Sequence, residues 1–227
     1  MTTKFVSDSS CDMQRFEGVN FSSVPLSITT DEINYIDDET LDVNNMIDYL
    51  AGYKGRSYTA CPSIESWLNS FNGADRIYVV TMTSTLSGTF NSAMTAREMY
   101  LQDHPDAEIH VFDTLSTGPE QRLFIEKLIE LDNADDSFET IINKAKSYLA
   151  KTRLFFALKS LHNFAQNGRI NKAIASAVGI LGISIFATAS DEGDVAPISK
   201  CRSEKKVLSS ILELSLIHIS EPTRLDV

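Results

Sequence analysis

The chain has 227 residues, of which 43% are hydrophobic and 22% charged, a composition typical of a folded protein with one large or two small domains. Its 20 basic and 31 acidic residues give a net charge of −11, which argues against nucleic-acid binding and against electrostatic docking to an anionic membrane. Three distant cysteines, Cys11, Cys61 and Cys201, form neither a metal-ligand pattern nor a disulfide framework. The first residues do not resemble a signal peptide, and the longest uncharged stretch, 173–189, is short and contains glycine, so we expect a cytoplasmic protein without membrane insertion.

Strand-like and helix-like segments alternate through the first two thirds of the chain. Strands are expected where residues are β-branched, aromatic or alternating, at 4–6, 21–28, 32–37, 76–80 and 108–112. Helices are expected where apolar residues recur at helical spacing, at 40–50, 64–71, 91–101, 120–131 and 137–149. The alternation predicts βαβ units and an α/β fold with a mostly parallel sheet.

The pattern changes near residue 150, where we place a domain boundary. The expected elements after it are a strand at 151–157, a short helix at 160–166 closed by Asn167 and Gly168, a helix at 171–181, strands at 183–189 and 195–201, and a helix at 203–213. Residues 191–194 form the expected hairpin loop between the last two strands. We therefore predict an N-terminal α/β domain at 1–150 and a smaller α/β domain at 151–213.

A hydroxyl-rich stretch at 81–93 joins the strand expected at 76–80 to the next helix. Ligands of open α/β sheets collect at the carboxyl ends of strands, and helix N-termini favour anions. Gly88 lets a ligand approach the backbone, while Ser84, Ser87 and Thr89 add uncharged donors. The same residue types are ordinary helix caps, so the pattern alone leaves anion binding and capping equally open.

Two other loops carry polar side chains. Asp8 and Asp12 follow the first strand, but the D-x-D pattern of one phosphatase class is absent, so capping of a turn or helix is favoured over a metal or phospho-aspartate site. Residues 59–63 form a second hydroxyl-rich loop, in which Pro62 biases Cys61 toward an extended conformation. Ser63 is predicted to cap the helix at 64–71.

Five motifs, in this order, resemble those of the DegV family of bacterial lipid-binding proteins. They lie at 6–13 (VSDSSCDM), 59–63 (TACPS), 83–93 (TSTLSGTFNSA), 111–114 (VFDT) and 167–170 (NGRI). The third is the most specific, since it is similar to the family's S-S-x-L-S-G-T-Y-x-S-A. Ala60 departs from the family's serine in the second motif, and Asn167 departs from its glycine in the fifth.

The resemblance implies a two-domain α/β architecture, the EDD fold, that holds one long-chain fatty acid between its domains. Residues 151–213 would be part of the lipid-binding second domain. The residues that it assigns to the fatty-acid carboxylate are Thr59, Ser84, Ser87, Gly88 and Thr89, and those that it assigns to the head-group or partner region are Arg169, Ser63 and Asp113.

The resemblance also implies a partner. A separate fatty-acid kinase would convert the presented carboxylate to an acyl phosphate for phospholipid synthesis. On this interpretation the chain is a binding subunit with no catalytic residue, no metal and no cofactor beyond the bound fatty acid. The apolar stretch 174–186 and the Phe155–Phe156 pair are candidates for the tunnel wall, although plain core packing is favoured for any one of these residues.

Two enzymatic alternatives remain open. A serine hydrolase acting on a small lipid would use Ser87, but no G-x-S-x-G elbow surrounds it and the four histidines show no evident pairing with it. A phosphotransferase subunit is suggested by the family's fold relatives, which include dihydroxyacetone kinase, but no Walker A motif is present to hold a nucleotide.

The last residues differ in character from the helix that precedes them. Residues 214–224, LSLIHISEPTR, match one for one a translation of DNA that resembles a transposase adapter used in sequencing libraries. We therefore expect 214–227 to be a non-native tail that packs poorly and carries no site, on a family member truncated at its C-terminus.

Overall fold

The computed structural model describes residues 1–134, 136–170 and 184–220, the last six of these by their backbone only. The chain divides into two compact units. Met1–Leu154 and Asp191–Asp194 form the first, and Phe155–Ser190 and Val195–Val227 form the second. Within the described residues, every helix is too short or too polar to cross a bilayer.

A four-stranded parallel sheet forms the centre of the first unit. Its strands are β1 (Thr3–Asp8), β2 (Phe21–Val24), β6 (Arg76–Thr81) and β7 (Glu108–Asp113), in the order β2-β1-β6-β7. All three pairings are parallel, and Val6 lies opposite Val79 in the central pair. The predicted α/β fold with a parallel sheet is confirmed.

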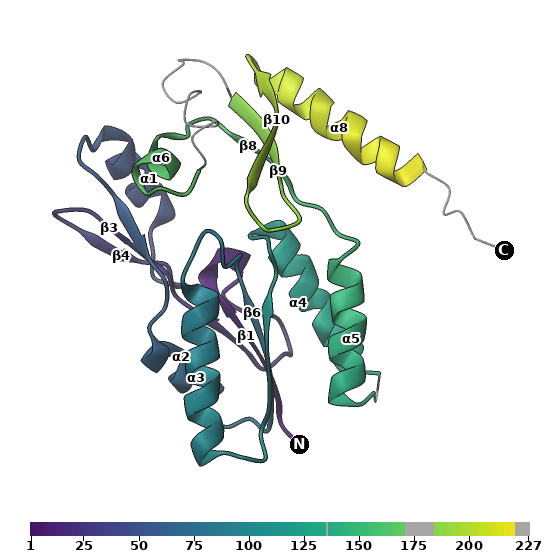
Figure 1. Cartoon of the computed structure of the whole chain (residues 1–227). Helices are drawn as coiled ribbons and strands as arrows, with labels where there is room; N and C mark the ends of the chain where they lie inside the picture. Colours follow the sequence, from purple (N-terminus) through teal and green to yellow (C-terminus); the bar gives the residue numbers. More distant parts are fainter. Residues whose placement is uncertain (135, 171–183, 221–227) are drawn as a thin grey trace. The chain divides into compact units, whose positions relative to one another are not determined.

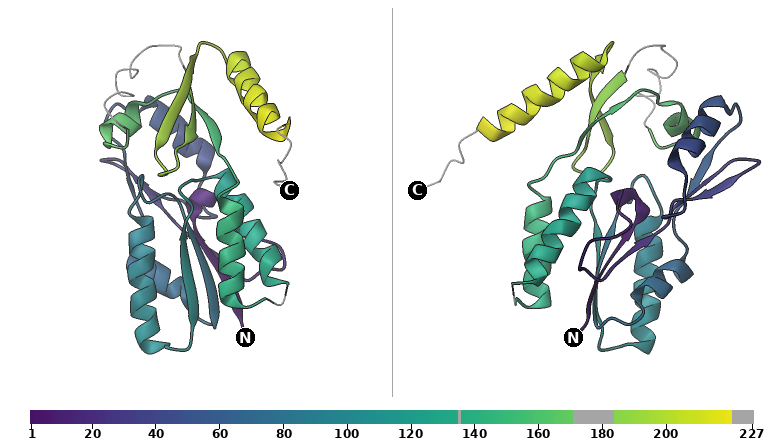
Figure 2. Two further views of the ribbon diagram at one scale, coloured as in Figure 1. Left: turned by 45° about the vertical axis from the view of Figure 1, so that its right-hand side comes forward. Right: turned by 180° about the vertical axis from the view of Figure 1, so that it is seen from behind.

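Helices cover both faces of this sheet (Figures 1 and 2). Alternate residues of β6 divide between two cores, with Ile77 and Val79 facing one and Tyr78 and Val80 facing the other. On the first face lie α2 (Ile64–Phe71) and α3 (Thr89–Asp103), and on the second lie α4 (Pro119–Asp132) and α5 (Phe138–Leu149). The sheet is therefore buried on both faces, as its near-continuous apolar strands require.

Local capping determines where two of these helices begin. The Ser63 side chain accepts the Ser66 amide at 3.1 Å, and the Ser137 side chain accepts the Thr140 amide at 3.3 Å. Each bond satisfies an amide that the helix itself cannot satisfy. The predicted cap at Ser63 is confirmed.

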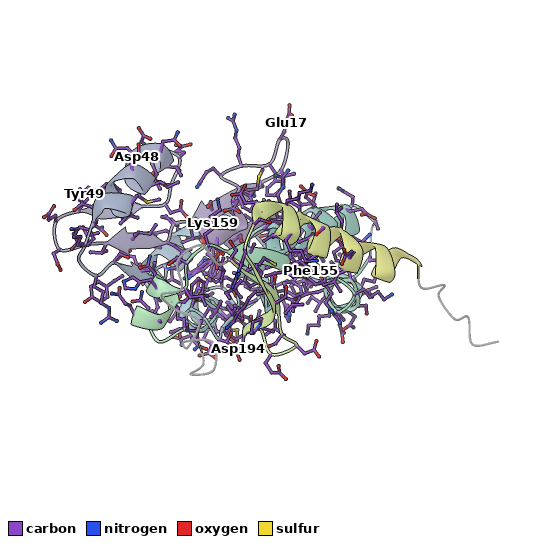
Figure 3. The ribbon with its side chains drawn as sticks, turned by 90° about the horizontal axis from the view of Figure 1, so that it is seen from above. Glu17, Asp48, Tyr49, Phe155, Lys159 and Asp194 are labelled. Atoms are coloured by element: carbon purple, nitrogen blue, oxygen red, sulfur yellow. The ribbon has the colours of Figure 1, made fainter. Side chains whose placement is uncertain are left out.

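A small antiparallel sheet, in the order β4-β3-β5, completes the first unit. Its strands are β3 (Ser27–Thr29), β4 (Asn34–Ile36) and β5 (Tyr58–Ala60). Helix α1 (Val43–Gly52) lies between β4 and β5 in the chain. Asp48 and Tyr49 project from α1 (Figure 3), and Tyr49 donates to Glu32 at 2.8 Å. The single strand predicted at 21–28 was wrong, because Pro25 cannot donate to a ladder and the chain leaves the large sheet there.

The second unit has an antiparallel sheet in the order β10-β9-β8. It contains β8 (Phe155–Leu158), α6 (His162–Gln166), β9 (Ser184–Ala189), β10 (Val195–Cys201) and α8 (Glu204–Ser220). Phe186, Cys201 and Val207 form its small core. Lys159, labelled in Figure 3, pairs with Glu204 at 2.6 Å.

Two boundaries in the second half differ from the prediction. The strand expected from residue 151 begins at Phe155, because the amides of Lys151 and Thr152 form a turn with Tyr148 and Leu149. The helix expected to end at Glu213 continues to Ser220. The helix predicted at 171–181 and the end of the tail at 221–227 lie outside the described residues.

Candidate functional site

The carboxyl ends of the parallel strands place three loops at one edge of the sheet. The chain leaves β1 toward β2 on one side, whereas β6 leads to β7 on the other, so the direction of the strand order switches between β1 and β6. In open α/β sheets, ligands bind in the crevice beyond such a switch point. The residues placed there are Asp8 at the end of β1 and residues 82–88, which lead from β6 into α3.

Hydrogen bonds from the neighbouring β7 loop fix the 82–88 loop. Asp113 Oδ1 accepts the Ser84 amide at 3.2 Å and the Leu115 amide at 3.1 Å. The Thr83 amide donates to the Ser116 carbonyl at 2.8 Å. These contacts use the backbone of Ser84, and its half-buried hydroxyl has no partner among the described residues. Asp113 therefore positions the loop and leaves a hydroxyl donor available.

The N-terminus of α3 presents further unused donors. Gly88 is the N-cap residue and supplies no side-chain cap, while the Ser87 hydroxyl accepts the Thr89 amide at 3.3 Å. Within the described part of the chain, the amides of Gly88, Phe90 and Asn91 have no acceptor. Free amides at the start of a 15-residue helix, with the positive end of its dipole, form an anion-binding surface.

The second hydroxyl-rich loop meets the first at Gly88. A Cβ added at Gly88 would lie 3.4 Å from the Cys61 sulfur, so the two loops are in close contact. Thr59 is exposed on β5, two residues before Cys61. Ser63 points its hydroxyl at the first turn of α2 and acts as a cap.

Asp8 is a fully buried carboxylate beneath the 82–88 loop. It caps the short 3-10 helix η1 (Ser9–Cys11) through the Ser10 amide, so the predicted capping role is confirmed. It also accepts bonds from Met82, Thr89 and Gln121. Burial raises the pKa of the Asp8 carboxyl, and these hydrogen bonds offset part of that rise.

Of the two remaining predicted site residues, Thr89 lies beneath the 82–88 loop and Arg169 lies in the second unit. Thr89 is fully buried, and its hydroxyl donates to Asp8 at 3.2 Å. Arg169 belongs to the second unit, where its amide donates to the Phe164 carbonyl just after α6. The structure thus brings together Ser84, Ser87, Gly88, Thr89 and Asp113, with the 59–63 loop against Gly88.

Sequence reasoning missed two contributors to this edge. Gln121 of α4 donates to both Ser7 and Asp8, and no local pattern marks it. Gly193, recognised only as a turn residue, accepts hydrogen bonds through its carbonyl from the hydroxyls of Thr83, at 3.1 Å, and Thr85, at 2.8 Å. Asp191–Asp194 belongs to the first unit, so this contact is internal to it.

The described residues hold neither a nucleophile–base pair at this edge nor a metal-ligand cluster. His104 stacks on Tyr100 and His110 packs against Phe112, while no described histidine bonds to Ser84 or Ser87. What the edge offers is a set of neutral donors around a helix N-terminus. The fold and site therefore define an α/β protein whose sheet edge, at the switch point, has the donors that suit a small anion.

Comparison with known proteins identifies the family. The chain belongs to the DegV family, whose model, described as an uncharacterised protein of that family, matches residues 2–227. A DegV domain-containing protein of Streptococcus gordonii is 40% identical over 217 residues, which is 94% of this chain and 77% of the relative.

Two solved structures are similar over nearly the whole chain. A DegV family protein from Eubacterium eligens, loaded with heptadecanoic acid, has a TM-score of 0.91 and 47% identity, covering 95% of this chain and 78% of that one. The Streptococcus pneumoniae Fatty Acid Kinase (Fak) B3 protein, loaded with linoleic acid, has a TM-score of 0.91 and 38% identity, covering 96% and 79%. Related DegV proteins of known structure thus carry fatty acids as ligands.

Proposed function

We propose that this protein binds a long-chain fatty acid and holds its carboxylate at the loop between β6 and α3. The observation that carries the proposal is the cluster of unused donors at one point of the sheet edge: the Ser84 hydroxyl and the amides of Gly88, Phe90 and Asn91. The fatty acids in the two similar structures support the choice of ligand.

The chemistry of the donors suits a carboxylate. Hydroxyls and amides can each donate to one of its oxygens, and such charge-assisted bonds are stronger than neutral ones. No buried lysine is needed, because the helix dipole supplies partial positive charge. Acyl-chain burial then adds about 0.8 kcal/mol per CH₂ before the cost of ordering the chain. Thr59, Ser84, Ser87 and Gly88 are the proposed direct contacts, with Thr89 supporting them from below.

We further propose that the protein presents this carboxylate to a separate kinase in the cytoplasm, which makes an acyl phosphate. The name of the Streptococcus pneumoniae relative supports the partner's class. Arg169, Ser63 and Asp113 remain the residues proposed for the head-group or partner region. The absence of a nucleophile–base pair among the described residues at the sheet edge supports a binding role over hydrolysis.

The test combines binding with the two proposed hydroxyls. Thr59→Ala together with Ser84→Ala is expected to weaken fatty-acid affinity by roughly 1–3 kcal/mol, or about 5- to 150-fold, as measured by isothermal titration calorimetry. Ser147→Ala is a matched control, because Ser147 lies on α5 and its hydroxyl only donates to the Asn143 carbonyl. Unchanged affinity in the double variant would place the carboxylate elsewhere. Acyl phosphate formed by the pure protein with ATP would contradict the binding-subunit role.

A further inference from the structure

One carboxylate oxygen holds both ends of the loop that carries the proposed site. Asp8 Oδ2 accepts the Met82 amide at 2.9 Å and the Thr89 hydroxyl at 3.2 Å. Met82 is the first residue after β6, and Thr89 is the first residue of α3. The span between these two residues contains Ser84, Ser87 and Gly88, so a single atom sets the distance that the loop must bridge.

The other carboxylate oxygen anchors Asp8 itself. Asp8 Oδ1 accepts the Ser10 amide at 3.2 Å, the Ser10 hydroxyl, and the Gln121 side-chain amide at 3.1 Å. Gln121 is also fully buried and bonds to Ser7 at 2.9 Å. Asp8 is the last residue of β1, and its Oδ1 atom is anchored by Ser10 of η1 and Gln121 of α4. The other oxygen, Oδ2, is therefore held in a fixed position against the loop.

This arrangement exceeds what a turn cap requires. Capping η1 uses one bond from the Ser10 amide, which a serine or asparagine would also accept. Burying a charge is costly unless many donors surround it, and here the donors at Oδ2 both belong to the ends of the 82–89 segment. Since Asp8 and Thr89 are both 0% exposed, neither side chain is available to a ligand.

We propose that Asp8 is a positioning residue of the carboxylate site. By joining the end of β6 to the N-terminus of α3, it holds the amides around Gly88 and the Ser84 hydroxyl at the separation that one carboxylate needs. This rests on the proposed function, in which those groups bind the fatty-acid head group. Asp8 acts through Met82 and Thr89 and does not touch the ligand.

The test compares a fatty acid with its own methyl ester, using cis-parinaric acid as a fluorescent probe and its ester as a competitor. Asp8→Asn and Thr89→Val are each expected to weaken acid binding at least ten-fold while changing ester binding less than two-fold. The variant with both substitutions should bind the acid no more weakly than whichever single variant binds it less tightly. Thr89→Ser, which keeps the hydroxyl, should restore acid binding.

Tyr100→Phe is the matched control. The Tyr100 hydroxyl also belongs to a buried side chain and donates to a backbone carbonyl, that of Phe71 at 3.3 Å, but it lies near the other end of α3 and makes no contact with Asp8. This variant should lower the melting temperature without changing the ratio of acid to ester affinity. Equal losses of acid and ester affinity in Asp8→Asn, or additive effects of the two substitutions, would overturn the proposal.

Amide hydrogen exchange separates failure of this inference from failure of the proposed function. Asp8→Asn and Thr89→Val should each accelerate exchange at residues 83–91, and the double variant should accelerate it no further. This readout needs no ligand. If the wild-type protein bound neither probe, the proposed function would fail, but hydrogen exchange in the single and double variants would still test whether Asp8 holds the two ends of the loop. Unchanged exchange in both single variants would refute that role of Asp8.

Discussion

His110 is a half-buried base on β7 whose environment disfavours its protonated form. The ring lies half-buried, 4.5 Å from the Phe112 ring. Burial lowers the pKa of His110 from 6.5 to about 4, and the positive charges of Lys146 and Arg97 act in the same direction. The folded protein therefore keeps this imidazole neutral at a pH where the unfolded chain protonates it.

A pH dependence of stability follows from this shift. Above pH 6.5 His110 is neutral in both states, and between pH 6.5 and about 4 only the unfolded state takes up the proton. The contribution of His110 to stability is thus complete above 6.5 and is lost as pH falls toward 4. Urea titrations from pH 7.5 to 4 should show a shallower decline for His110→Gln than for wild type.

Removing one of the positive charges that lower the pKa of His110 provides a second check of its part in acid sensitivity. Lys146→Gln should also make the decline shallower, whereas Lys151→Gln should not, because Lys151 is not among the charges that act on His110. Identical slopes for wild type and His110→Gln would show that other groups determine acid sensitivity.

At the scale of residues, local patterns located the hydroxyl-rich loop but not what holds it. Residues 81–93 were recognised because a strand, a glycine and a helix follow one another within the motif. The bonds from Asp8 to Met82 and Thr89 join residues 74 and 81 positions apart. No short-range spacing encodes such bonds, because they depend on the parallel pairing of β1 with β6. The long-range ties of the site could therefore be found only in the structure.

At the scale of elements, long periodic segments were predicted well and short edge strands were not. The strand β6 and the helices α2 and α5 follow from their apolar patterns, and the start of α2 follows also from its cap at Ser63. β5 was missed because its three residues are all exposed and are ordered by pairing with β3, a contact about 30 residues away in sequence. A strand of that kind has no apolar alternation to reveal it.

The loop joining β9 to β10 provides a prediction at this scale. Gly193 has φ +87°, and a Cβ there would overlap Thr83 Oγ1 and lie 3.0 Å from the Leu115 Cα. Gly193→Ala should therefore cost about 2–4 kcal/mol, the sum of backbone strain and overpacking. Chemical denaturation would measure the loss, and the hydroxyl-rich loop should become less protected from hydrogen exchange.

Gly73 is a matched control for this substitution. Its φ of +81° is nearly the same, but nothing lies within 4 Å of an added Cβ. Gly73→Ala should cost only about 1 kcal/mol, from backbone strain alone. Equal losses in the two variants would mean that the close contact of Gly193 with Thr83 and Leu115 is unimportant.

At the scale of the whole molecule, truncation can test whether the residues after Leu214 contribute to stability and to fatty-acid binding. Val207 of α8 is 7% exposed and packs with Phe186 and Cys201, and Leu214 contacts the same cluster. A chain ending at Leu214 keeps these contacts and should retain the melting temperature and fatty-acid affinity of the full 227 residues. Val207→Ala, by comparison, should cost about 1–3 kcal/mol. A lower melting temperature for the truncated chain would contradict the expectation that the tail is dispensable.

The position of β1 in the large sheet has a consequence for the order of folding during synthesis. β1 precedes β2 and β6 in the chain, yet it lies between them in the sheet, and the Ser7 hydroxyl donates to the Val80 carbonyl, 73 residues later. Until β6 leaves the ribosome, β1 can pair only with β2, and its other edge stays open. Closing so long a loop is entropically costly, which slows folding. The nascent chain therefore exposes one unpaired edge of a central strand until residues 76–81 emerge, an interval in which chaperone binding would protect it from aggregation.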